Sequence, residues 1–230
     1  MNLKLLFAFL LLSQFVLGQT TNDSTLVDSR YREDQFYVSA TYNLLANKHQ
    51  DVSQRGFSSG FHLGFIRDMP INKKRNVAVG LGIGLSANSY NQNLLIDEIP
   101  GGYTYTVLDE DDTSFSKNKF TTYVLEVPLE FRWRTSDAST YKFWRIYSGL
   151  KFGYVFANST KFKGNSETIK LTNVSDFNTI QYGLTLSAGY DTWNIHFYYA
   201  LNPIFESSAK IEDATIDMSV ARIGIMFYIL

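Results

Sequence analysis

The chain has 230 residues, a formal net charge of −1 and no cysteine. The balanced charge gives no basic excess for nucleic acid, and the lack of cysteine excludes disulfides and thiol chemistry. The aromatic content is high at 16%, with 18 Phe and 15 Tyr. Because these side chains favour strands and membrane interfaces, the composition indicates β-structure near a membrane.

The N-terminus has the features of an export signal. Lys4 precedes the apolar run Leu5–Leu12, and the small residues Val16 and Gly18 stand at the two positions that signal peptidase inspects. We therefore expect a signal peptide that is cleaved after residue 18. An uncleaved anchor is the alternative, but the apolar core is short. No later stretch approaches the ~18 apolar residues that a spanning helix needs, so we expect no helical anchor.

Hydrophobic alternation dominates the remaining sequence. Within residues 77–86 every second residue is Val, Leu or Ile, and the residues between them are Ala, Gly or Ser. A period of two predicts a strand, here with one apolar face and one face of very small residues, as the lumen of a narrow barrel requires. In chain order, the eight segments with this alternation are 36–44, 57–65, 77–85, 123–133, 144–156, 180–190, 193–201 and 221–229.

The predicted strands are about ten residues long, enough to cross the ~25 Å apolar band of an outer membrane at a tilt near 45°. The links between them alternate in length, as in a barrel with short periplasmic turns and long extracellular loops. The short links are 67–75, 135–142 and 191–192, and the long links are 46–55, 90–119, 159–177 and 202–213.

These patterns predict an all-β fold, an eight-stranded antiparallel transmembrane β-barrel in a bacterial outer membrane. The expected division is a signal peptide (1–18), an N-terminal periplasmic segment (19–34) and a barrel domain (35–230).

The three tryptophans offer a separate indication. Trp133, Trp144 and Trp193 all fall on predicted outward faces beside short links. We expect them to form the periplasmic half of an aromatic girdle. The alternative is that they are strand tryptophans at a protein interface.

Several charged residues fall on predicted inward faces. Across the link 135–142 we expect Arg132 beside Arg145, and Glu126 opposite Lys151. A charge in a small lumen needs a partner, because an unpaired one costs several kcal/mol of desolvation. We therefore predict a salt-bridged plug. Its expected members are Glu126, Glu130, Arg132, Arg145, Lys151, His62, His196 and Arg222.

Other functions for the inward residues remain open. They could line a narrow pore or a pocket for a small ligand. A lipid-modifying enzyme would need a nucleophile, a base and an orienting acid together, and no spacing groups Ser58 or Ser187 with His62 or His196 and a carboxylate. We therefore predict no enzyme, no catalytic residue and no cofactor.

The long link 90–119 is rich in carboxylates, which could bind Ca²⁺. The Gly and distant Glu of an EF-hand are missing after Asp109, so we predict a solvated loop and no metal site. Within the same link, the segment Tyr103–Val107 suggests that the barrel strands extend above the membrane as a hairpin or rim.

One motif resembles a known family. The segment Tyr123–Arg132, which reads YVLEVPLEFR, is similar to the middle strand of the PorT-like outer-membrane β-barrel proteins of the Bacteroidota, and Tyr147–Gly153 and Gly183–Tyr190 resemble that family's glycine-bearing strands. The resemblance implies an eight-stranded outer-membrane barrel and matches Glu126 and Pro128 to a recurrent pair. Because proline lacks a ladder donor, Pro128 should mark a bulge or irregular pairing.

The expected function is that of a non-enzymatic barrel with a filled lumen and a structural or secretion-associated role. The expected partners are outer-membrane lipid and other envelope or secretion-system proteins, and not nucleic acid.

Overall fold

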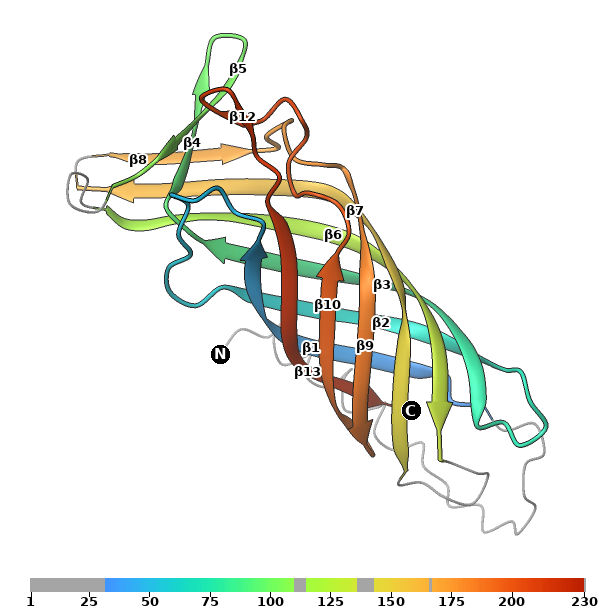
Figure 1. Ribbon diagram of the computed structural model, residues 1–230. Helices are drawn as coiled ribbons and strands as arrows, with labels where there is room; N and C mark the ends of the chain where they lie inside the picture. The colour runs from blue at the N-terminus through green and yellow to red at the C-terminus, as the bar shows by residue number, and fades with distance from the viewer. Residues whose placement is uncertain (1–31, 110–114, 136–142, 166, 230) are drawn as a thin grey trace, which may run out of the picture.

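The computed structural model describes residues 32–109, 115–135, 143–165 and 167–229, and Figure 1 shows their arrangement. The expected signal peptide, most of the 19–34 segment and the link 136–142 lie outside the described residues. The strands are β1 (Gln35–Ala46), β2 (Ser59–Pro70), β3 (Val77–Asn91), β4 (Leu94–Ile99), β5 (Gly102–Val107), β6 (Phe115–Arg134), β7 (Trp144–Gly164), β8 (Thr168–Thr172), β9 (Ile180–Tyr190), β10 (Trp193–Ala200), β11 (Lys210–Ile211), β12 (Ala214–Thr215) and β13 (Ser219–Ile229).

Eight of these strands close into an antiparallel barrel. Their order around the wall is β1, β2, β3, β6, β7, β9, β10 and β13, and β13 pairs with β1 from Phe36↔Ile229 to Ala46↔Ser219. The predicted all-β, eight-stranded antiparallel barrel is therefore confirmed. Closure leaves none of these eight strands without two neighbours, which removes the exposed edges of an open sheet.

Among the described residues, no helix is both long and apolar enough to cross a membrane.

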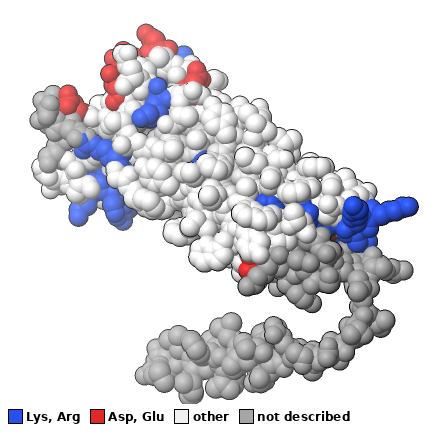
Figure 2. Space-filling view, turned by 60° about the horizontal axis from the view of Figure 1, so that its bottom comes forward, with Lys and Arg blue, Asp and Glu red and all other residues white. Residues whose placement is uncertain are grey.

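The wall of the barrel follows the predicted alternation. In β9, for example, Leu184 and Leu186 are half-exposed on the outer face, whereas Thr185 and Ser187 are buried inside. Figure 2 shows the result as a broad band without charges between two groups of basic side chains at opposite ends of the molecule. Such an apolar surface is unfavourable in water and suits a lipid environment.

The links also alternate in length, but six of the eight barrel strands are longer than predicted, whereas β9 has the predicted bounds and β10 ends one residue earlier. β2 continues to Pro70, so Arg67 and Asp68 belong to the strand and the first short link is reduced to 71–76. β6 and β7 have 20 and 21 residues, about twice the expected length. Hydrophobicity marked only the lipid-facing part of each strand, because polar and charged residues continue the ladder beyond it.

The long links contain β-structure of their own. β4 and β5 form a hairpin that includes the hairpin expected at Tyr103–Val107, and β7 continues past the barrel to pair with β8. Figure 1 shows these elements together at the end of the barrel opposite the short turns.

Pro128 pairs regularly with Lys151 on β7, but the β3–β6 ladder is interrupted between Leu81↔Leu129 and Gly84↔Glu126. The predicted irregularity at Pro128 thus lies on its β3 side. The register shifts between β6 and β7 are elsewhere, at Phe115/Lys117 and Tyr123/Val124.

Substitution of Gly149 should strongly destabilise the barrel. A Cβ at this position would lie 2.0 Å from the backbone oxygen of Leu129 and 2.8 Å from the Cα of Glu130. Since the obstacle is backbone of the neighbouring strand, Gly149→Ala should cost about 1–3 kcal/mol, as overpacking typically does. The measurement is the urea midpoint of unfolding in detergent micelles. Gly102→Ala is the control, since nothing lies within 4 Å of its Cβ position; equal midpoints for the two variants would contradict the prediction.

Candidate functional site in the barrel lumen

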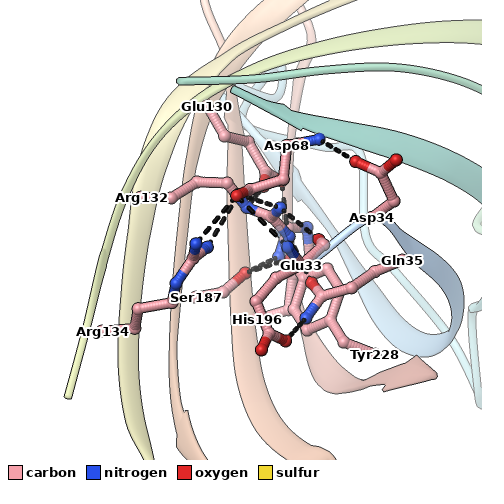
Figure 3. A network of polar contacts seen from close by, with 10 residues as sticks. All are labelled: Glu33, Asp34, Gln35, Asp68, Glu130, Arg132, Arg134, Ser187, His196 and Tyr228. Atoms are coloured by element: carbon pink, nitrogen blue, oxygen red, sulfur yellow. Dashed lines mark hydrogen bonds and ion pairs between the residues drawn. The ribbon is translucent and has the colours of Figure 1, made fainter. Parts of the chain in front are cut away.

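A buried carboxylate joins two arginines at the short-turn end of the lumen. Asp68 projects inward from β2, and its Oδ1 accepts hydrogen bonds from Arg132 at 2.9 Å and Arg134 at 2.8 Å. A second bond from Arg134, to Oδ2 at 2.8 Å, makes that pair bidentate. All three side chains are fully buried. Figure 3 shows Asp68 between the two guanidinium groups.

The segment that leads into β1 completes this cluster. Arg132 donates to the backbone oxygen of Glu33 at 3.2 Å and to the side-chain oxygen of Gln35. The Asp34 carboxylate accepts the backbone N–H of Asp68 at 2.8 Å. Burial raises the pKa of the Glu33 carboxyl above its usual range, while nearby Arg134 opposes the shift. The N-terminal residues thus close the lumen at this end.

The pairing of β6 with β7 differs from the prediction by two residues. Arg145 lies opposite Arg134, whereas Arg132 lies opposite Tyr147. The expected pairing of Arg132 directly with Arg145 is therefore wrong in register, because the alternation defines the face of a residue but not its register. Both guanidinium groups nevertheless lie over the Tyr228 ring, each 5.7 Å from its centroid. Arg132 also lies over the Tyr147 ring, 4.2 Å from its centroid.

A second cluster surrounds Glu126 halfway along the lumen. One carboxylate oxygen lies 3.1 Å from Nδ1 of His62 and 3.9 Å from Arg222, and the other lies 3.1 Å from Nζ of Lys151. Glu126 is not opposite Lys151, as expected, but opposite Gly153, so the ion pair runs diagonally between the strands. All four side chains are buried.

Glu130 and His196 occupy the level between these two clusters. Glu130 lies 3.4 Å from Nε of Arg132 and accepts a 3.4 Å hydrogen bond from the Tyr228 hydroxyl. His196 is 2.7 Å from the hydroxyl of Ser187 through Nδ1. The structure thus places the eight predicted lumen residues in the two clusters and at the level between them. Arg145 lies at the short-turn end over the rings of Phe143 and Tyr228.

The loops fill the opposite end of the lumen with apolar side chains. Phe120 of β6 packs against Phe177 and Phe205 from two different loops, with ring centroids 5.5 and 5.7 Å away. Tyr90 stacks on Phe120 and accepts a 3.1 Å hydrogen bond from Arg222, which connects this cap to the Glu126 cluster. The buried members of the cap include Leu45, Val52, Leu94, Ile96, Tyr105, Val174, Ile204, Ile211, Ile216 and Met218.

Sequence reasoning missed several of these residues. Asp68 and Arg134 were placed in or next to links, although Asp68 keeps the inward phase of His62 and Arg134 that of Arg132. Continuing the two-residue alternation beyond the apolar part of each strand would have assigned both Asp68 and Arg134 to the lumen. The cap had no such signal, because it forms from four separate links.

In the described part of the lumen neither Ser58 nor Ser187 belongs to a serine–histidine–carboxylate arrangement. Thr41, His62 and Glu126 do form a hydroxyl–histidine–carboxylate chain, with contacts of 3.3 and 3.1 Å. Ser187 and His196 form a pair, but within the described part of the chain no carboxylate contacts His196. Ser58 hydrogen-bonds the backbone N–H of Asn91 and no histidine. In the described residues no three His, Asp or Glu side chains are placed to hold a metal ion. Most carboxylates of the 109–112 cluster lie outside the described residues.

The three tryptophans lie on the outer face beside short turns. Trp144 and Trp193 are each 61% exposed, and Trp133 is 39% exposed. Trp144 packs on Tyr190 across the β7–β9 pair, and Trp193 packs on Phe227 across the β10–β13 pair.

The closed barrel, its apolar outer face and its polar interior define the class of an outer-membrane β-barrel protein. Residues 13–206 match the family described as outer membrane protein beta-barrel domain, and the chain belongs to that family. Membership in this family supports the location of the protein in the outer membrane.

No curated protein matches the chain. Among solved structures it is similar to Ail, the attachment invasion locus protein of Yersinia pestis, at 13% identity and a TM-score of 0.34, over 85% of this chain and 96% of that one. A second structure of Ail, in complex with the heparin analogue sucrose octasulfate, gives 15% identity and a TM-score of 0.35, over 86% and 97% of the two chains.

Proposed function

We propose that this protein is a PorT-like, non-enzymatic barrel whose lumen is closed by its own side chains, and that it has a structural or secretion-associated role in the outer membrane. It reaches the membrane through a signal peptide, residues 1–18, that is cleaved on export. Its partners are the surrounding lipid and other proteins of the envelope or secretion machinery.

The observation that supports this proposal is the arrangement of buried side chains in three successive layers along the lumen. The Asp68 cluster closes the short-turn end, the Glu126 cluster crosses the middle, and the aromatic cap around Phe120 closes the end with the long loops. Eight strands enclose an interior that side chains alone can fill. A path for solutes would have to break ion pairs in two layers and displace packed rings in the third.

Single-channel recording tests the closed lumen. The mature protein, folded in detergent and inserted into planar bilayers, should show no stable open level across the usual voltage range. An unrelated open porin in the same bilayers is the positive control for insertion and detection. A reproducible conducting level from this protein would contradict the proposal and favour the alternative function, a narrow pore.

Lipid turnover tests the non-enzymatic assignment. The folded protein should leave phospholipid and lipid A unchanged, because Ser187 and His196 lack an orienting carboxylate in the described lumen. Thr41, His62 and Glu126 are linked to one another but are buried, away from the surrounding lipid. Hydrolysis or acyl transfer that disappears in His196→Ala or His62→Ala would overturn it.

A further inference from the structure

Five lysines gather on the projecting part of the β6–β7–β8 sheet. Lys117 lies directly opposite Lys163, Lys119 opposite Lys161, and Lys161 also opposite Lys170. Side chains in such positions have Cβ atoms about 4.5–5.5 Å apart, and like charges there repel each other. We call these five residues the lysine patch. Figure 2 shows basic side chains gathered at the end where this sheet projects.

All five lysines lie on the outer face of the wall. On β7, Phe162 is buried on the inner face between Lys161 and Lys163, and on β6, Asn118 is buried between Lys117 and Lys119. The patch therefore faces away from the lumen and is not part of the plug.

Within the described part of the chain, no carboxylate lies within ion-pair distance of the patch. The only hydrogen bond of its ammonium groups in this part of the chain is that of Lys119 to the hydroxyl of Ser89, at 3.4 Å. Within the described residues, therefore, no carboxylate offsets the repulsion among the lysines, and an external anion would do so. A surface of this kind attracts polyanionic groups such as phosphates.

The height of the patch indicates which anion it meets. Below it on the outer face, Tyr123 and Phe156 form an exposed aromatic pair at the upper edge of the apolar band, with ring centroids 6.4 Å apart. Lys119 is four residues above Tyr123 on the same strand, which is about 14 Å along the strand or about 10 Å in height at a tilt near 45°. Lysine stems are long enough to turn back towards the headgroup layer.

We propose that the lysine patch binds the phosphate groups of anionic lipid headgroups in the outer leaflet. Aromatic side chains contact the acyl boundary, and the lysines above them neutralise the phosphates. The site lies on one side of the barrel only, so it would fix a lipid against β6–β8. The inference rests on the proposed membrane placement and goes beyond it by assigning the ligand's chemistry and its residues.

The test compares matched pairs of lysines at opposite ends of the molecule. The mature barrel in neutral detergent is titrated with bis-phosphorylated lipid A and with its dephosphorylated form, and bound lipid is counted by native mass spectrometry. Lys161→Gln/Lys163→Gln removes two charges from the patch, and Lys73→Gln/Lys74→Gln removes two from the β2–β3 turn. At about a factor of five per lysine, the patch variant should bind phosphorylated lipid about 25-fold more weakly, while the turn variant should match the unmodified protein.

Several outcomes would overturn the proposal. These are binding by the patch variant equal to that of the unmodified protein, equal binding of the two lipid A forms, and full displacement of lipid by inorganic phosphate, which would indicate a site for free anions. The difference in gel mobility between unheated and boiled samples, measured for every variant, verifies that the barrel is folded. Loss of that shift in the unmodified protein would instead refute the membrane barrel itself, so the two failures are distinguishable.

Discussion

Asp68→Ala should destabilise the barrel by about 3–5 kcal/mol, because it removes the carboxylate that two fully buried guanidinium groups share. Arg132 and Arg134 are fully buried at the short-turn end of the lumen, so loss of the carboxylate leaves their charges without this partner. The measurement is urea unfolding in detergent micelles. Its readout at each urea concentration is the fraction of protein that still migrates on a gel as the compact, unheated form. A short-turn end that opens more readily should lower the midpoint without changing the strand content of the folded state.

Two controls separate charge from shape in this experiment. Asp97→Ala removes a carboxylate from the β4–β5 hairpin, outside the lumen, and should change stability by less than about 0.5 kcal/mol. The triple variant Asp68→Leu/Arg132→Met/Arg134→Met replaces the whole ion network by apolar groups and should recover most of the loss. A triple variant as unstable as Asp68→Ala would mean that packing, and not an uncompensated charge, explains the effect.

Glu126→Ala should have an effect of similar size, about 3–5 kcal/mol, since this single carboxylate faces three basic side chains in the middle of the lumen. The substitution leaves the buried ammonium group of Lys151, 3.1 Å from the carboxylate, without this ion-pair partner. Glu126→Gln keeps the shape and two hydrogen-bonding atoms but loses the charge. Its stability should therefore lie between those of the unmodified protein and Glu126→Ala. The same unfolding measurement gives both values.

A double-mutant cycle on Glu126 and Lys151 gives the coupling directly. Replacing both by apolar residues of similar volume, Glu126→Leu/Lys151→Met, should be less harmful than the sum of the single replacements by about 1–3 kcal/mol. Additive losses would show that the diagonal contact contributes nothing. Glu98→Gln, on the exposed hairpin, is the surface control.

Much of the wall could be predicted because barrel strands repeat every two residues. The alternation in residues 77–86 and 180–190 defines which side chains face lipid, and these assignments do not depend on any distant contact. The same logic placed Glu126, Arg132 and Lys151 inside before any partner was known. It failed at the strand ends, where Asp68 continues the inward phase but the outward-facing charge of Arg67 interrupts the apolar alternation.

Register could not be predicted in the same way. Moving β6 against β7 by two residues keeps every side chain on its own face, so the hydrophobic pattern does not distinguish Arg134↔Arg145 from Arg132↔Arg145. The choice depends on the link between the strands, on the register shift at Tyr123/Val124 and on the closure of the whole wall.

By itself, the sequence determined the class of fold, the number of barrel strands and the faces of their residues, because each follows from local periodicity and the lengths of the links. Only the tertiary structure decided which charges meet, how the loops form the cap around Phe120 and how the lysines of β6, β7 and β8 come together. These features join residues that are far apart in the chain. Their positions depend on barrel closure and strand register, which no local pattern encodes.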